Sequence, residues 1–134
     1  MSKPEFKARL SLRADISPSE DPAKVSQAMR DVVGEVGPES VREEAGYLTT
    51  DDPEALSRLR DQLRDRHVRS AARRQMLLNV TRDSTSLMIN RQAAAAGVVA
   101  LCGSPAESPL GPIYLTIKAS KIQSVIDWLT AYPG

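Results

Sequence analysis

Residues 5–14, EFKARLSLRA, alternate between apolar and polar side chains, and this stretch decides the fold class. One side of an extended chain would carry the apolar members, which are Phe6, Ala8, Leu10, Leu12 and Ala14. The other side would carry Lys7, Arg9, Ser11 and Arg13. Because successive side chains of a strand point to opposite faces, the sequence predicts a half-buried strand whose outer face is basic.

The same alternation returns near the C-terminus in residues 111–120, GPIYLTIKAS, where Ile113, Leu115 and Ile117 would face the core. Shorter apolar runs predict strands at 84–90 and 97–102, and a weaker alternation predicts one over 41–47. The outward face of the resulting sheet would bear Lys7, Arg9, Arg13, Tyr114 and Lys118.

Three helices are predicted from capping residues and apolar periodicity. The first spans about 22–33, with Asp21 placed to cap it and Pro22 in its first turn. The second spans about 53–80 with a bend, and the third, over about 120–131, has apolar side chains at helical spacing. Together these elements predict a single α+β domain over residues 1–134, a mainly antiparallel sheet with helices packed on one face.

The composition is that of a soluble globular protein, since 41% of the 134 residues are hydrophobic and 26% are charged. The apolar run at 93–102 is far shorter than the roughly 20 residues that a membrane-spanning helix needs. The N-terminus lacks the apolar core of a signal peptide, and the single cysteine, Cys102, fits a reducing compartment. We therefore expect a cytoplasmic protein with no membrane partner.

Residues 58–75, RLRDQLRDRHVRSAARRQ, hold seven arginines although the net charge of the chain is only +1. On a continuous helix, one side would carry Leu56, Leu63, His67, Ala71 and Leu78. A separate stripe roughly 80° wide would carry Arg58, Arg66, Arg69 and Arg73. A basic stripe of this kind is suited to binding the phosphates of a nucleic acid.

The arginines have a second interpretation, in which they belong to a solvated helix and pair with acidic side chains. Asp61 and Asp65 are near them in sequence, and residues 14–54 hold eleven acidic groups against three basic ones. Both interpretations stay open at this level, because charges distant in sequence can neutralise one another in the fold.

Few residues favour catalysis. His67, the only histidine, would pack beside Leu63 and Ala71, and Cys102 ends an apolar run where a buried thiol is expected. Metal-ligand spacings, the phosphate-binding loop and the dinucleotide motif are all absent from the sequence. We therefore expect no enzyme and no cofactor, unless folding forms a cleft that joins His67 to a carboxylate.

Four segments, LRDRHVRSAAR, INRQAAAAG, SPLGPI and IDWL, resemble in order and spacing the UPF0201 family, an archaea-specific family of uncharacterised proteins. Residues that match its pattern as they stand are Asn90, Gln92, Ala93, Ala94, Gly97 and 109–113, whereas Arg91 replaces the usual lysine. The helix departs from the family pattern at Val68, Ser70 and Arg73. The resemblance implies an α+β fold like that of ribosomal proteins that bind 5S RNA, and a homodimer.

Two functional hypotheses follow. The protein is either a homodimeric interaction or scaffold module, or an RNA-associated protein that binds phosphates through the arginine-rich helix or the basic sheet face. Candidate phosphate contacts are Arg58, Arg66, Arg69, Arg73, Asn90, Arg91, Gln92, Lys7, Arg9, Arg13 and Lys118. Asn90 and Gln92 have the structural alternative of bonding the backbone at a strand end. Trp128 is expected to anchor the last helix against the sheet.

Overall fold

The computed structural model describes residues 7–107 and 110–131 of the chain. Its strands are β1 (Ala8–Arg13), β2 (Val41–Glu44), β3 (Tyr47–Thr50), β4 (Ser84–Ile89) and β5 (Ile113–Ala119). Its α-helices are α1 (Pro22–Val33), α2 (Pro53–Gln62), α3 (Arg66–Leu78), α4 (Arg91–Ala95) and α5 (Ile122–Leu129). Two short 3-10 helices, η1 (Pro38–Ser40) and η2 (Pro105–Glu107), lie in loops.

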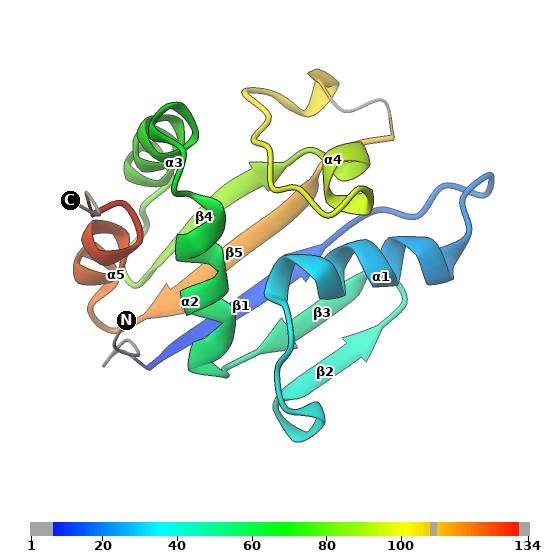
Figure 1. Cartoon of the computed structure of the whole chain (residues 1–134), viewed down its shortest axis with the longest axis horizontal. Coiled ribbons are helices and arrows are strands. Elements are labelled where there is room, and N and C mark those ends of the chain that lie inside the picture. The colour runs from blue at the N-terminus through cyan, green and yellow to red at the C-terminus, as the bar shows by residue number, and fades with distance from the viewer. Residues whose placement is uncertain (1–6, 108–109, 132–134) are drawn as a thin grey trace.

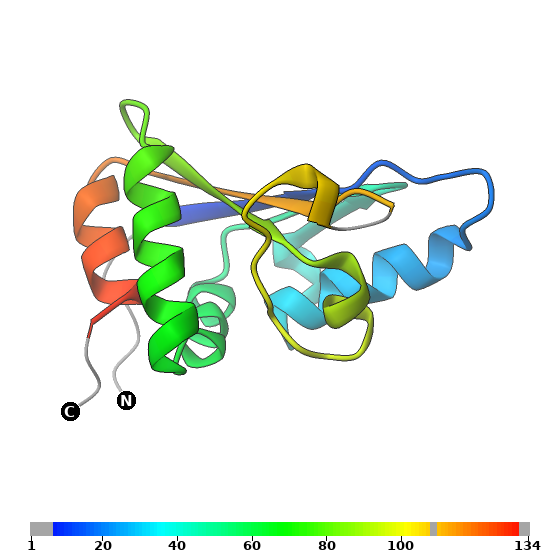
Figure 2. The same ribbon diagram turned by 90° about the horizontal axis from the view of Figure 1, so that it is seen from above.

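The strands form one antiparallel sheet in the order β2-β3-β1-β5-β4 (Figure 1). Seen edge-on, the sheet has its α-helices on one side only (Figure 2). This arrangement confirms the predicted α+β fold with helices packed on one face of an antiparallel sheet. Among the residues that the structure describes, no α-helix lies over the opposite face of the sheet.

The central strands β1 and β5 supply the middle of the core. Leu10 lies opposite Ile117 and Leu12 opposite Leu115, and all four side chains are at most 1% exposed. Removing such side chains from water stabilises the fold by about 2 kcal/mol each, which fixes the register of the two strands. The predicted alternation over 5–14 is confirmed in β1, and Phe6 lies outside the described residues.

The predicted single strand over 41–47 is wrong, because a turn divides it into the hairpin of β2 and β3. Gly46 forms this turn with φ +77°, and a Cβ atom there would lie 2.6 Å from the carbonyl oxygen of Ala14. Only glycine fits such a position without strain. The turn also reverses the chain, so that Val41 and Tyr47 lie on opposite faces of the sheet.

The predicted bent helix over 53–80 is two separate helices. The side chain of Asp65 accepts hydrogen bonds from the backbone N–H groups of His67 and Val68, at 2.9 and 3.2 Å, and caps the start of α3. These bonds and their charge-assisted character hold the pKa of Asp65 below its usual value. Residues 63–65 are not helical. The faces of α3 therefore cannot be predicted by continuing the rotation of 100° per residue from α2.

The buried face of α3 therefore differs from the predicted one. Ala72 and Met76 are fully buried, whereas His67 and Leu78 are exposed. The prediction that His67 packs beside Leu63 and Ala71 is wrong for the same reason, since it assumed one continuous helix.

The predicted strand at 97–102 is also wrong, because only Leu101 forms an isolated bridge, to Ile89. The short helix α4 precedes it and was not predicted. Its cap is Asn90, whose side-chain oxygen accepts a hydrogen bond from the N–H of Ala93 at 3.0 Å. Gly97 follows with φ +83°, a backbone angle that favours glycine.

Candidate nucleic-acid interface

The face of the sheet without helices carries mostly polar side chains from all five strands. We call this surface the open face, and its residues are Arg42, Glu44, Tyr47, Thr49, Arg9, Ser11, Arg13, Tyr114, Thr116, Lys118, Ser84, Ser86 and Met88. The register of the strands arranges them in three rows that run across the sheet. Each row has a different chemistry.

The first row of the open face places an arginine between two tyrosines. Arg13 on β1 lies opposite Tyr47 on β3 and opposite Tyr114 on β5. The guanidinium carbon of Arg13 is 4.6 Å from the centroid of the Tyr114 ring, a cation–π contact. Arg13 also forms an exposed ion pair of 3.3 Å with Asp15. Tyr47 is 40% exposed, so this row offers an aromatic surface to solvent.

The middle row carries hydroxyl side chains on four strands and ends in Arg42 on β2, which lies opposite Thr49. Thr49, Ser11, Thr116 and Ser86 follow one another across four strands. The hydroxyl oxygens of Ser11 and Thr49 are 3.2 Å apart, and Thr49 donates a hydrogen bond of 3.0 Å to the carbonyl oxygen of Leu10. These groups give the centre of the face both donors and acceptors.

The third row is basic. Arg9 on β1 and Lys118 on β5 lie directly opposite each other, and both side chains are exposed. Like charges in directly opposite positions destabilise a sheet. Among the described residues, no carboxylate lies within ion-pair distance of either cation. Both border a hollow of about 970 Å³, which Lys7, Asp51 and Asp83 also line.

The predicted arginine stripe is divided between two helices, with Arg58 on α2 and the other three members, Arg66, Arg69 and Arg73, on α3. Arg58 on α2 donates a hydrogen bond of 2.9 Å from Nε to the carbonyl oxygen of Asp31 at the end of α1. Arg69 donates one of 3.2 Å to the carbonyl oxygen of Arg64, and Arg66 is the first residue of α3.

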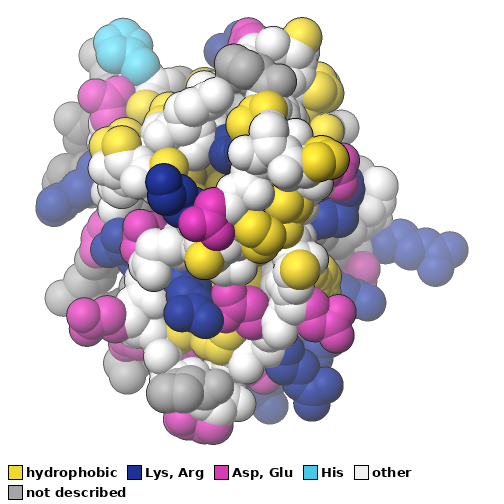
Figure 3. Space-filling view, turned by 90° about the vertical axis from the view of Figure 1, so that its right-hand side faces the viewer, with side chains coloured by type: hydrophobic (Ala, Val, Ile, Leu, Met, Phe, Trp, Pro, Cys, Tyr) yellow, Lys and Arg dark blue, Asp and Glu magenta, His cyan; other side chains and the backbone are white. Residues whose placement is uncertain are grey.

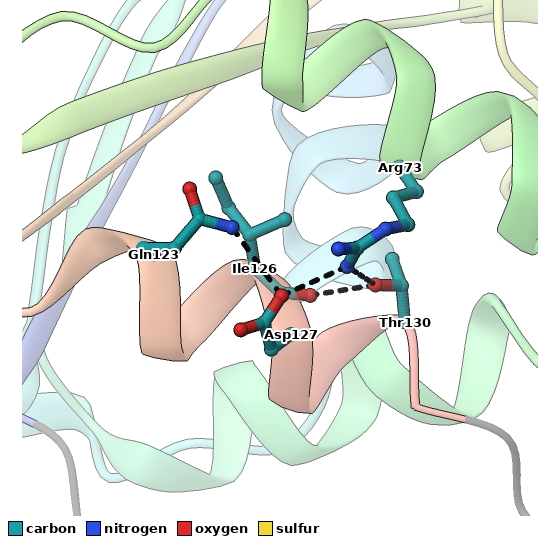
Figure 4. Close-up of polar contacts among 5 residues, drawn as sticks. All are labelled: Arg73, Gln123, Ile126, Asp127 and Thr130. Atoms are coloured by element: carbon teal, nitrogen blue, oxygen red, sulfur yellow. Dashed lines mark hydrogen bonds and ion pairs between the residues drawn. The ribbon is translucent and has the colours of Figure 1, made fainter.

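Arg73 joins α3 to the last helix, as Figure 4 shows. Its Nη1 donates to Asp127 Oδ1 at 2.9 Å and to Thr130 Oγ1 at 3.0 Å. Arg73 therefore pairs with an acid of α5, outside the acidic segment 14–54. The described contacts of Arg58 and Arg73 hold helices together.

Arg91, the central residue of the segment 90–92, points into the interior. Arg91 is 5% exposed, and its Nη1 lies 2.6 Å from Oε1 of Glu20. Within the described part of the chain, Nε and Nη2 of Arg91 are buried without a hydrogen-bond partner. Asn90 caps α4 with its side chain, as the structural alternative of bonding the backbone expected. Arg91 is therefore turned toward the interior, away from any surface phosphate.

Glu20 is held in its charged form by these contacts. Burial opposes ionisation, but the N–H of Ser17, 2.8 Å away, and the guanidinium of Arg91 outweigh it and keep the pKa of Glu20 below its usual value. Arg91 and Glu20 thus form a charged pair in the interior.

The structure places both residues that were considered for catalysis, His67 and Cys102. His67 is exposed, and its backbone N–H donates a hydrogen bond to the side chain of Asp65. Burial, with the charge of Glu107, raises the pKa of the Cys102 thiol, which disfavours the reactive thiolate. Across 7–107 and 110–131, no three His, Cys, Asp or Glu side chains gather as metal ligands. No helix in these ranges has the length and apolar character needed to cross a membrane.

The remaining charged groups are mixed in sign. On the end of the molecule drawn in Figure 3, basic and acidic side chains lie among one another. Arg30 pairs with Glu43 at 2.6 Å, and this carboxylate raises the pKa of Arg30. Trp128 packs partly against the core, as an anchor should, and Arg60 lies 4.8 Å above its ring, so that the indole also joins α5 to α2.

Sequence reasoning missed Tyr47 and Arg42 as members of the open face. The period of two over 41–47 placed Tyr47 with Val41, on the same side, because the turn at Gly46 was not recognised. The dipeptide Ala45-Gly46 between two short polar stretches was the signal for a hairpin.

The sequence is similar to UPF0201 proteins of archaea. The protein of Sulfurisphaera tokodaii is 35% identical over 128 residues, which cover 91% of this chain and 86% of the relative. The protein of Aeropyrum pernix is 36% identical over 130 residues, which cover 92% of this chain and 85% of the relative. A search with models of protein families gave no match.

Two solved structures have the same fold. The UPF0201 protein of Methanococcus jannaschii superposes with a TM-score of 0.71 at 20% identity, over 94% of this chain and 95% of that one. A second crystal structure of an uncharacterised UPF0201 protein gives a TM-score of 0.70 at 23% identity, over 91% and 92% of the two chains.

Proposed function

The chain belongs to the archaeal UPF0201 family, and from this premise we propose that it is a non-catalytic, RNA-associated protein that binds single-stranded RNA across its open face. The observation that carries the proposal is the basic row, in which Arg9 and Lys118 lie directly opposite each other without an acidic partner among the described residues. A phosphate between them would remove their repulsion.

The other two rows fit the bases and sugars of a single strand. Unpaired bases stack on aromatic side chains, and the first row offers the exposed Tyr47 and the half-buried Tyr114 on either side of Arg13. The hydroxyl row offers hydrogen bonds to ribose or base edges. A single strand suits this surface better than a duplex, because the bases of a duplex are stacked inside and cannot reach the tyrosines.

The fold resemblance to ribosomal 5S-RNA-binding proteins, stated above from the sequence, points in the same direction. It supports the proposal only by analogy, since one fold serves many functions. The arginine-rich helices α2 and α3 supply a weaker argument, because Arg58 and Arg73 already contact neighbouring helices.

The test is a titration of a short, fluorescently labelled single-stranded RNA of mixed sequence, with binding read as anisotropy at several salt concentrations. The logarithm of affinity should fall linearly with the logarithm of salt, by about 0.7 for each phosphate contacted. The double variant Arg9→Gln/Lys118→Gln should weaken binding and lower this slope by about one to two contacts.

A matched control is Lys24→Gln, which removes one exposed cation on α1, the helix side of the sheet. This variant should bind RNA as the unchanged protein does. Equal affinity and slope in the Arg9/Lys118 variant would reject the open face as the RNA site, and absence of binding at low salt would reject RNA association altogether.

A second candidate function is a homodimeric interaction or scaffold module. The observation that favours it is the outer edge of β2, which no other described strand covers, since an edge strand with free backbone groups can pair with another chain. Sedimentation equilibrium should then give a mass near twice 14.6 kDa at micromolar concentration. A monomer at every concentration would reject this candidate.

A further inference from the structure

The two edges of the sheet differ in whether their outer backbone groups already have hydrogen-bond partners. The β4 edge is closed by side chains of α3 and by residues 100–102. Gln75 accepts a hydrogen bond of 2.6 Å from the N–H of Met88 and donates one of 2.9 Å to the carbonyl oxygen of Cys102. Asn79 donates to the carbonyl oxygen of Ser86 at 3.1 Å, and the N–H of Cys102 donates to the carbonyl oxygen of Met88 at 2.9 Å. These bonds take the places that another strand would use.

In the part of the chain that the structure describes, the β2 edge has no such cover. In Figure 1, β2 forms the rim of the sheet, with no helix alongside it and η1 only at its start. Among the described residues, the backbone of β2 has hydrogen-bonded neighbours on one side only, in β3. Its outer N–H and C=O groups are therefore available to a further strand.

The side chains of β2 alternate between the two faces of the sheet and restrict which strand can pair with it. Arg42 and Glu44 are exposed and project from the open face. Val41 and Glu43 lie on the helix side, where Glu43 accepts hydrogen bonds from Nε and Nη2 of Arg30 at 2.9 and 2.6 Å. A partner strand must therefore match an arginine and a glutamate that are two residues apart on one face.

We propose that the outer edge of β2 pairs antiparallel with the same edge of a second copy, in the register that centres on Glu43. This proposal deepens the second candidate function and rests on it. Directly opposed residues of two strands share a face, so a twofold axis through the sheet can centre only on a residue. Centred on Glu43, the pairing sets Arg42 opposite Glu44 of the second copy, twice.

The neighbouring registers are disfavoured by charge. A pairing centred on Arg42 would oppose Arg42 to itself, and one centred on Glu44 would oppose Glu44 to itself. In the register centred on Glu43, the two opposed glutamates each keep their own Arg30. The two sheets then continue into one, with both open faces on the same side, so that an RNA strand would meet a surface of double length.

The test is sedimentation equilibrium over a concentration series at low salt, with Arg42→Glu, Glu44→Arg and the double exchange Arg42→Glu/Glu44→Arg. Each single change replaces two attractions with two repulsions and should raise the dimer Kd about tenfold or more. The double exchange restores opposite charges across the interface and should return the Kd to near its original value.

The control is Lys24→Glu, which changes the charge as Arg42→Glu does but lies exposed on α1 and should leave the Kd unchanged. Thermal unfolding shows whether each variant is folded, and exposed positions should tolerate these changes. Self-association that no exchange at Arg42 or Glu44 alters, or that the double exchange fails to restore, would overturn this register while the interaction module survives. A strictly monomeric protein would overturn both.

Discussion

Arg91 and Arg9 carry the same charge in opposite surroundings. The side chain of Arg91 is 6% exposed and lies 2.6 Å from Glu20, whereas Arg9 is exposed and lies opposite Lys118. In the interior, a charge loses its hydration and is tolerated only with a partner. On the open face, water screens the repulsion of two cations, so that a like-charged pair survives at small expense. The interior arginine therefore serves stability, and the surface one is the arginine that we propose to bind RNA.

The largest loss of stability should come from removing the partner of the buried arginine. Glu20→Gln keeps the shape of the side chain and an acceptor for the N–H of Ser17 but removes the charge beside Arg91. We expect the free energy of unfolding to fall by about 3 kcal/mol, measured by urea denaturation, because the guanidinium is left buried and unpaired.

The double variant Glu20→Leu/Arg91→Met is the control, since it removes both charges and leaves apolar side chains. It should recover most of the lost stability. A loss as small as that of an exposed pair would show that water reaches Arg91 and that the interior pair is not a stabilising element.

Acid pH should protonate Glu20 and so remove the attraction between Glu20 and Arg91 gradually. The pKa of Glu20 in the folded protein is below its ordinary value of 4.5, so the folded state favours the carboxylate. This stability is fully present above pH 4.5 and is lost as the pH falls through the folded pKa, by about 1.4 kcal/mol for each pKa unit. The stability difference between the unchanged protein and Glu20→Gln should therefore shrink below pH 4.5 in urea titrations. Parallel curves down to the acid transition would contradict the assignment.

Removing one charge of the like-charged surface pair should stabilise the protein, and by less than the loss expected for Glu20→Gln. Lys118→Gln removes one cation of the basic row and should raise the free energy of unfolding by about 0.5 kcal/mol while it weakens RNA binding. Thermal unfolding and the anisotropy titration measure the two effects. Lys24→Gln should change neither, and a Lys118 variant that loses stability would show that the cation has a structural partner.

The exposed ion pair between Arg73 and Asp127 should matter least. Their side chains are 43% and 56% exposed, and such pairs contribute about 0.5 kcal/mol or less to stability. We expect the free energy of unfolding of Arg73→Gln to lie within that margin of the value for the unchanged protein. Its affinity for RNA should be the same as that of the unchanged protein. A drop in RNA affinity with unchanged stability would return the RNA site to the arginine-rich helices.

Local patterns were sufficient where a single element decides the outcome. The alternation over 8–13 and 113–118 predicted two central strands and the side to which Arg9, Arg13, Tyr114 and Lys118 point. The cap at Asp21, whose side chain accepts from Ala23 N–H, likewise marked the start of α1. In each case, the period or the capping bond lies within a few residues of the feature predicted.

Patterns failed where a short interruption changes the geometry. The turn at Gly46 and the break at Leu63–Asp65 each reverse or reset the chain, and the periodicity on either side gives no sign of the new direction. The errors at Tyr47 and His67 both come from carrying one period across such an interruption. Signals for both were present, in a glycine and in an aspartate placed to cap a new helix.

The α+β class, the apolar core and the basic character of one sheet face can be predicted from the residues alone, because these depend on which residues alternate along a strand. Which arginines stay accessible on the surface depends on the fold. Arg91 turned inward to Glu20, Arg73 reached α5, and Arg9 came to lie opposite Lys118. These neighbours are distant in sequence, and a side chain's charge has its effect only through the groups that folding brings within a few ångströms of it.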